Sequence, residues 1–89
     1  MITNVISEAH DVRAPSSQID SILQDANAIE ASVMHTGARL ALYKIHDGRY
    51  AVEIKRCSER RLWVDESIAN IREQYEWLKF LNSDFGATE

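Results

Sequence analysis

Cysteine, proline, glycine and long apolar runs are all scarce in this sequence of 89 residues. The single cysteine, Cys57, excludes an internal disulfide and is typical of a protein in a reducing compartment. No window approaches the roughly 18 apolar residues of a membrane span, and the start of the chain has no basic segment followed by an apolar one. We therefore expect a soluble protein of the cytoplasm that is neither exported nor bound to a membrane.

Motifs for catalysis, phosphate binding and metal binding are also missing. The chain has no Gly-rich phosphate loop, no G-x-S-x-G or H-E-x-x-H motif and no paired catalytic carboxylates. None of the histidines, His10, His35 and His46, has a second ligand at the spacing of a zinc site. A nucleophilic Cys57 would need a histidine beside it in the fold, and an ordinary turn residue is the favoured interpretation. The sequence predicts no enzyme, no cofactor and no metal ion.

The composition of the chain is typical of one small globular domain. Hydrophobic residues make up 45% and charged residues 27% of the chain, which excludes a disordered tail and supplies one core only. Residues 1–15 contain a short apolar stretch without a clear period, and we expect a flexible arm or a loose edge strand there. Residues 16–89 are expected to form a single compact α+β domain.

A β-hairpin that turns at Asp47-Gly48 is the clearest local feature. From Arg39 onward the apolar residues recur with a period of two, and Asp-Gly between two such runs is typical of a tight hairpin. After a turn at 57–59, residues 60–64 have the pattern of a third, shorter strand. The sequence therefore predicts a three-stranded antiparallel sheet.

The loop of this hairpin has two possible lengths, and each gives a different register. A two-residue loop pairs Ile45 with Tyr50, whereas a three-residue loop with Gly48 in the left-handed conformation pairs Leu42 with Val52. In both registers the first strand has apolar side chains on both faces, so we expect it to be covered on both sides. The second strand is expected to keep one wet face, formed by Arg49, Ala51, Glu53 and Lys55.

An N-terminal helix is predicted to start at Ser16-Ser17, whose hydroxyls are suitable N-cap groups. Apolar residues then recur at spacings of three and four, which is typical of one helix face. Gly37 is the expected stop signal, so the helix would span most of residues 16–36. The apolar stripe consists of Ile19, Ile22, Leu23, Ala26, Ile29 and Val33.

A C-terminal amphipathic helix is predicted to begin with Asp65 as its N-cap and to pack on the sheet. Trp77 and Phe80 lie on the other side of this helix, with Leu81 between the two sides. These three residues, the aromatic face, are either covered by the N-terminal helix or arm, or exposed for a partner. The stripe expected to cover the sheet consists of Ile68, Ile71, Tyr75 and Leu78.

Charge is unevenly distributed along the chain. Residues 1–38 and 62–89 each carry a net charge of −4, whereas residues 39–61 carry +4. Arginines beside an aromatic residue can combine phosphate contacts with base stacking, so segment 55–63 makes nucleic-acid binding the alternative function. The net charge of −4 for the whole chain argues against it.

The function we expect is binding of another protein without catalysis. Small acidic inhibitors, antitoxins, immunity or anti-defence proteins and adaptor subunits act in this way. Either the aromatic face or the basic segment would form the contact, and a symmetric homodimer that buries the aromatic face is a further possibility. The candidate residues are Trp77, Phe80 and Leu81 in the aromatic face, and Arg56, Arg60, Arg61 and Trp63 in what we call the basic ridge.

Overall fold

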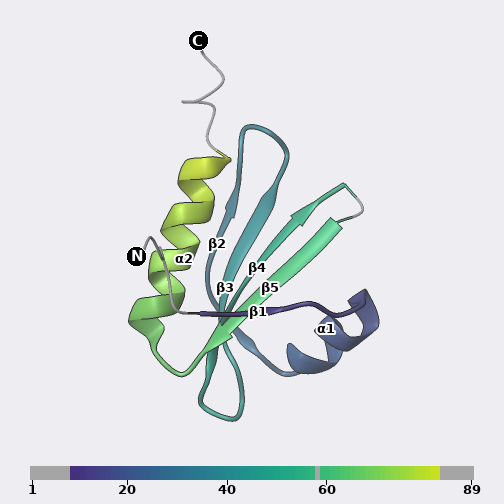
Figure 1. Ribbon diagram of the computed structural model, residues 1–89, viewed down its shortest axis with the longest axis vertical. Coiled ribbons are helices and arrows are strands. Elements are labelled where there is room, and N and C mark those ends of the chain that lie inside the picture. Colours follow the sequence, from purple (N-terminus) through teal and green to yellow (C-terminus); the bar gives the residue numbers. More distant parts are fainter. Residues whose placement is uncertain (1–8, 58, 83–89) are drawn as a thin grey trace, which may run out of the picture.

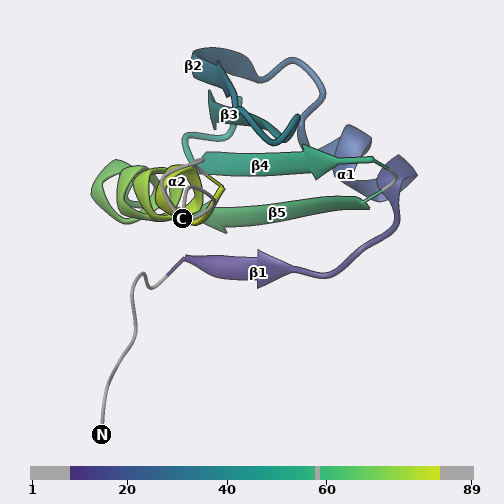
Figure 2. The same cartoon turned by 90° about the horizontal axis from the view of Figure 1, so that it is seen from above.

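The chain forms a five-stranded antiparallel sheet with one helix on each face (Figure 1). The computed structural model describes residues 9–57 and 59–82. The strands lie in the order β1-β5-β4-β3-β2, which Figure 2 shows from bottom to top. In chain order the elements are β1 (His10–Val12), α1 (Ser16–Ile22), β2 (Asn27–Val33), β3 (Arg39–Lys44), β4 (Tyr50–Arg56), β5 (Glu59–Asp65) and α2 (Ile68–Leu81).

The α+β class and the C-terminal helix on an antiparallel sheet are confirmed, but the sheet has five strands instead of three. β1 pairs with β5 and β2 pairs with β3, so the two additional strands form the two edges of the sheet. β1 lies within the segment 1–15, for which the sequence predicted either a flexible arm or a loose edge strand. Both edge strands come from the first 33 residues. β1 pairs with a distant segment of the chain, whereas β2 forms a hairpin with β3, the next strand.

The N-terminal helix is much shorter than predicted. α1 has seven residues, and its N-cap is Pro15 instead of a serine, with no side-chain cap hydrogen bond. The backbone carbonyl of Pro15 accepts from the N–H groups of Gln18 and Ile19. After the helix, Asp25 adopts a positive φ of 63°, a left-handed conformation that interrupts helical hydrogen bonding.

Residues 27–33, predicted to be helical, form the edge strand β2. Ile29 and Val33 are four residues apart, a spacing that places two side chains on one face of a strand as well as of a helix. Pairing with β3 satisfies the backbone groups of the segment and selects the strand. Gly37, with a φ of 95°, serves the turn between β2 and β3 instead of ending a helix.

β3 and β4 form the predicted hairpin at Asp47-Gly48 with the longer of the two loops. Leu42 pairs with Val52, and the N–H of Ile45 donates to the carbonyl of Arg49 at 2.7 Å, which leaves three residues in the loop. Gly48 has a φ of 96°, a conformation that glycine adopts without the steric cost of a side chain.

The expectation of a wet face on the second hairpin strand is wrong, because β4 is the central strand of the sheet. Ala51 and Glu53 are only 0% and 6% exposed. Only the residues near the ends of the strand, Arg49 and Lys55, are exposed. A three-stranded sheet would have left the middle of this face open, whereas two further strands and α1 close it.

Each face of the sheet has its own apolar core, because the side chains of a strand point alternately to the two faces. We call these faces the α2 face and the α1 face after the helix that covers each. The core of the α2 face consists of Ala38, Leu40, Leu42, Val52, Ile54, Trp63, Ile71, Tyr75 and Leu78. The core of the α1 face consists of Ile19, Ile45, Ala51, Leu62 and Val64.

α2 packs on the sheet with the predicted side but begins later than predicted. Its N-cap is Ser67, whose hydroxyl accepts from the N–H of Asn70 at 3.3 Å. The carboxylate of Asp65 accepts from the Asn70 side-chain amide at 2.7 Å and from the Ser67 N–H at 3.2 Å. These bonds, the first above all, lower the pKa of Asp65. The buried residues of the helix are Ile71, Gln74, Tyr75 and Leu78, whereas Ile68 is 39% exposed.

Candidate binding groove

The sheet divides the predicted basic ridge between its two faces. Arg60 and Arg61 are neighbours in β5, so their side chains point in opposite directions. Arg61 lies on the α2 face with Trp63 and Arg56, whereas Arg60 contacts α1 on the α1 face. The basic ridge is therefore not one surface.

Arg56, Arg61 and Trp63 line a groove on the α2 face, and the C-terminal end of α2 forms its other wall. Leu81 of the aromatic face belongs to that wall, so the two surfaces predicted as alternatives adjoin each other. Trp63 is only 7% exposed and contributes to the core as well as to the groove. The groove, called the α2 groove below, has a volume of about 160 Å³ and is lined by Ile54, Arg56, Glu59, Arg61, Trp63, Leu78, Leu81 and Asn82.

Polar contacts hold the end of the α2 groove that lies next to the turn between β4 and β5. The guanidinium of Arg56 donates to the side-chain oxygen of Asn82 and to the carboxylate of Glu59, both at 3.4 Å. Asn82 is the C-cap residue of α2, and its side-chain amide donates to the carbonyl of Leu78 at 2.8 Å. Arg56 therefore links the end of the helix to the end of the sheet.

Arg61 is held on the adjoining part of the groove by two neighbours. Its guanidinium donates to the carboxylate of Asp11 in β1 at 2.9 Å. The guanidinium carbon also lies 4.7 Å from the centroid of the Trp63 ring, a cation–π geometry. The Arg61 side chain remains 52% exposed, so one side of the guanidinium is accessible from the groove.

Exposed apolar surface on α2 adjoins the α2 groove at Leu81, which lines the groove. Phe80 and Leu81 are 54% and 56% exposed. Trp77 is half-buried, and its ring stacks on Phe80 with 5.6 Å between the centroids. The N-terminal helix does not cover this surface, because α1 lies on the opposite face, and residues 1–8 lie outside the described residues.

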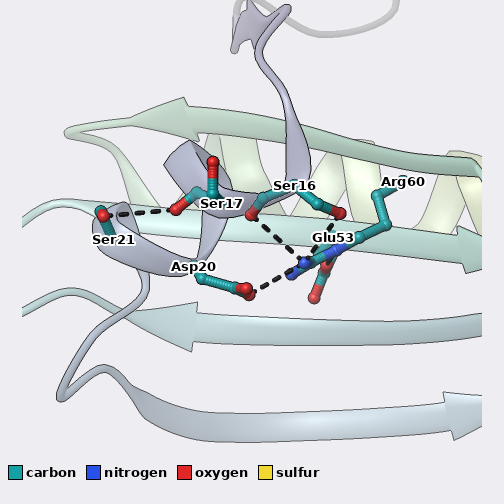
Figure 3. Close-up of polar contacts among 6 residues, drawn as sticks. All are labelled: Ser16, Ser17, Asp20, Ser21, Glu53 and Arg60. Carbon is teal, nitrogen blue, oxygen red and sulfur yellow. Dashed lines mark hydrogen bonds and ion pairs between the residues drawn. The ribbon is translucent and has the colours of Figure 1, made fainter.

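Arg60 has a structural role on the α1 face (Figure 3). It donates to Glu53 at 2.6 Å and to Asp20 at 2.8 Å, and so connects β5 with β4 and α1. Burial alone would lower the pKa of Arg60, but the hydrogen bonds to Asp20 and Glu53 outweigh it and raise the pKa. The arginine therefore remains charged beside the buried Glu53 carboxylate.

Tyr43 lies on the α1 face near the charges of Glu53 and Arg60. Burial, and then the charge of Glu53, raises the pKa of Tyr43 above its usual value, so the phenol stays protonated. Cys57 is an exposed turn residue with a φ of 49°. Within residues 9–57 and 59–82, no group of three or more His, Cys, Asp or Glu residues is placed to hold a metal ion. No helix in this part of the chain is long and apolar enough to cross a membrane.

Sequence reasoning missed two polar residues of the α2 groove, Glu59 and Asn82. Asparagine directly after the last apolar residue of a helix is a known stop signal, and it was available in the sequence. Glu59 was assigned to a turn, whereas it is the first residue of β5 and pairs with Arg56. The opposite directions of Arg60 and Arg61 also follow from the period of two, once both residues are assigned to one strand.

The chain matches no protein-family model, no curated protein and no solved structure.

Proposed function

We propose that this chain is a small protein-binding module without catalytic activity, of the inhibitor, antitoxin, immunity, anti-defence or adaptor type. Its binding surface is the α2 groove together with the aromatic face. The observation that carries this proposal is the exposure of Phe80 and Leu81 beside a groove lined by Arg56 and Arg61.

Burial of this apolar surface supplies the driving force for binding. A fully buried Leu or Phe side chain contributes about 1.5–3 kcal/mol, so two half-exposed side chains contribute roughly that amount together when a partner covers them. The ring of Trp77 stacks on the ring of Phe80, which restricts Phe80 before binding and so reduces the conformational freedom that it loses on binding. Aromatic residues and arginine are the side chains most enriched where interfaces bind most strongly.

The arginines of the groove favour a protein over a nucleic acid as the partner. Arg56 pairs with Glu59, Arg60 with Glu53 and Arg61 with Asp11. Each positive charge of the basic ridge therefore has a carboxylate beside it, which reduces the attraction for phosphates. Partly exposed arginines that are already oriented remain suited to polar contacts at the rim of a protein interface.

Capture of partner proteins from the native cell lysate tests this proposal. The bait is the full chain, compared with a double variant, Phe80→Glu with Leu81→Glu, that places charge on the exposed apolar surface. Ile68→Glu is the matched control, because Ile68 is an exposed apolar residue at the other end of the same helix. Circular dichroism and thermal melting establish that all three proteins are folded.

We expect a partner that is retained by the wild type and by Ile68→Glu and lost by the double variant. If the double variant retains every partner of the wild type, the proposed surface is wrong. Sedimentation of the wild type and the double variant identifies a homodimer, in which the partner is a second copy of this chain and only the double variant is monomeric. Parallel titrations with RNA and DNA at two salt concentrations test the nucleic-acid alternative.

A further inference from the structure

A row of three cations crosses the α1 face at one level of the sheet. Arg39 in β3 lies directly opposite Lys55 in β4, and Lys55 lies directly opposite Arg60 in β5. Like charges directly opposite each other on neighbouring strands destabilise a sheet. The row is therefore a place where nearby negative charge stabilises the protein.

Within residues 9–57 and 59–82, carboxylates within ion-pair distance are present at Arg60 but not at the other two cations. Asp20 and Glu53 lie 2.8 Å and 2.6 Å from the Arg60 guanidinium (Figure 3). Neither Arg39 nor Lys55 has a carboxylate within ion-pair distance in the described part of the chain, and both are exposed. Two neighbouring positive charges on this half of the face are thus left without a counter-charge.

A shallow cavity with both apolar and polar residues in its lining adjoins these two cations, and its one carboxylate, that of Glu53, is paired with Arg60. Ala31 and Ala41 are small residues that pair with each other across β2 and β3, and they leave room above the sheet. Tyr43 and Val33 stand on either side, and Val33 is 73% exposed. The cavity measures about 300 Å³, enough for one apolar side chain with the backbone next to it.

α1 leaves this part of the face open because it is short. Its buried residue Ile19 packs with Leu62 and Val64 of β5 and with Ile45 at the end of β3, and the helix ends at Ile22. The α1 face therefore has a closed half over β5 and an open half over β2 and β3. We call the open half the β2–β3 surface and define it by Ala31, Val33, Arg39, Ala41, Tyr43 and Lys55. The lining of its cavity also includes Ser32, Leu40 and Glu53, and the carboxylate of Glu53 is buried against Arg60.

We propose that the β2–β3 surface binds an acidic segment of a partner protein. An apolar side chain of that segment fills the cavity between Val33 and Tyr43, and flanking carboxylates pair with Arg39 and Lys55. The carboxylates of the bound segment then supply a negative charge next to these two cations, as Glu53 and Asp20 do for Arg60. This surface lies on the opposite face from the α2 groove and does not depend on the function proposed for that groove.

An acidic polypeptide fits this surface better than a nucleic acid does. The two free cations stand beside apolar residues instead of forming a long basic stripe, and the chain as a whole carries a net charge of −4. A partner with carboxylates on either side of a leucine matches both the charge and the cavity, and complementary charges at the rim select that partner among others.

Fluorescence anisotropy with a designed peptide tests the proposal. The probe is a fluorescein-labelled peptide in which a leucine is flanked by two glutamates on each side, and the reference probe carries glutamine in place of every glutamate. The test variant combines Arg39→Gln with Lys55→Gln. The matched control combines Lys44→Gln with Arg49→Gln, which removes the same amount of charge from exposed residues of the same hairpin.

The wild type and the control variant should bind the acidic peptide, whereas the test variant should bind it about tenfold more weakly, since two exposed ion pairs are lost. The glutamine peptide should bind the wild type more weakly by at least the same factor. The proposal would be overturned if the test and control variants lost the same affinity for the acidic peptide. It would also be overturned if the wild type bound the acidic and the glutamine peptide equally. Tighter binding of an RNA oligonucleotide of the same charge would overturn it in favour of a nucleic acid.

Thermal melting without any peptide gives a second readout. The test variant should melt at a higher temperature than the wild type, because it removes the repulsion between Arg39 and Lys55. A lower melting temperature than that of the control variant would mean that these cations stabilise the fold, and would contradict the proposal. Peptide binding by the variant with Phe80→Glu and Leu81→Glu should equal that of the wild type, which separates this surface from the α2 groove.

Discussion

The same five strands form both faces of the sheet, but the two faces are closed by different means. The α2 face is covered by a helix of 14 residues that buries a continuous apolar stripe. The α1 face is covered by a helix of seven residues that buries Ile19 alone. Next to this helix the α1 face is held by the ion-pair cluster of Arg60, Glu53 and Asp20, and beyond it the β2–β3 surface is open.

This difference separates the part of the molecule that stabilises the fold from the part that is free for contacts. Most of the large, fully buried side chains belong to the α2 face, so most of the hydrophobic stabilisation arises there. Substitutions on the open half of the α1 face should change the free energy of unfolding only a little, because the side chains there contact solvent. Two substitution experiments measure how large the difference is, and a third measures how strongly the start of α2 is held.

The largest expected effects come from removing one leucine from each core. Leu42 on the α2 face and Leu62 on the α1 face are both 0% exposed. We expect Leu42→Ala to lower the free energy of unfolding by about 3–5 kcal/mol and Leu62→Ala by about 2–3 kcal/mol, since the short α1 can move into the space left by Leu62. Urea denaturation of both variants measures the two losses. Equal losses would show that the cores are equally rigid.

A smaller loss is expected from Arg60→Ala. The variant leaves the buried carboxylate of Glu53 without its cation, and we expect the free energy of unfolding to fall by about 2–3 kcal/mol. Arg39→Ala is the matched control on the same row of the sheet, and it should change stability by at most about 0.5 kcal/mol. The same urea titration checks both values. A loss for Arg39→Ala as large as that for Arg60→Ala would remove the distinction between the two halves of the α1 face.

The smallest effect is expected at Asp65, which fastens the start of α2, and it depends on pH. The folded state lowers the pKa of Asp65 below 3.8, so its carboxylate stabilises the protein above that pH. This stabilisation is lost as the pH falls through the lowered pKa. Asp65→Asn should cost about 1 kcal/mol at pH 7, because an amide keeps one acceptor oxygen for the two donors and has no charge.

Thermal melting of the wild type and Asp65→Asn between pH 7 and pH 2 measures this dependence. The two melting temperatures should converge as the pH approaches 2. Glu66→Gln changes an exposed carboxylate next to Asp65 and serves as the control, whose difference from the wild type should be small throughout. A difference between the wild type and Asp65→Asn that persists unchanged at pH 2 would contradict the role of the charge.

The elements that the sequence predicts well are those determined by neighbouring residues. The hairpin at Asp47-Gly48 follows from one turn signal and a period of two, and α2 follows from its apolar stripe. In contrast, β2 was predicted as part of a helix because Ile29 and Val33 have a spacing that fits both structures. Its pairing with β3 decided between the two, and the turn at Gly37 that connects the two strands was interpreted as the end of a helix.

The candidate site was only partly predictable for the same reason. The proximity of Leu81 to Arg56 and Arg61 depends on how α2 lies across β4 and β5, which no local pattern shows. The burial of Glu53 depends on the number of strands, and the predicted sheet had three strands instead of five. The separation of Arg60 from Arg61 was predictable, because it requires only that both residues belong to one strand.

The strand order also has a consequence for the way the protein folds. β3, β4 and β5 are consecutive in the sequence and adjacent in the sheet, so short loops connect them and their pairing costs little chain entropy. The same holds for β2, because only residues 34–38 connect it to β3. β1 is different, because residues 10–12 pair with residues 62–64 of β5. We infer that β1 docks last and opens first. Amide hydrogen exchange should then be fastest in β1 and slowest in β4, and equal protection in all five strands would exclude this order.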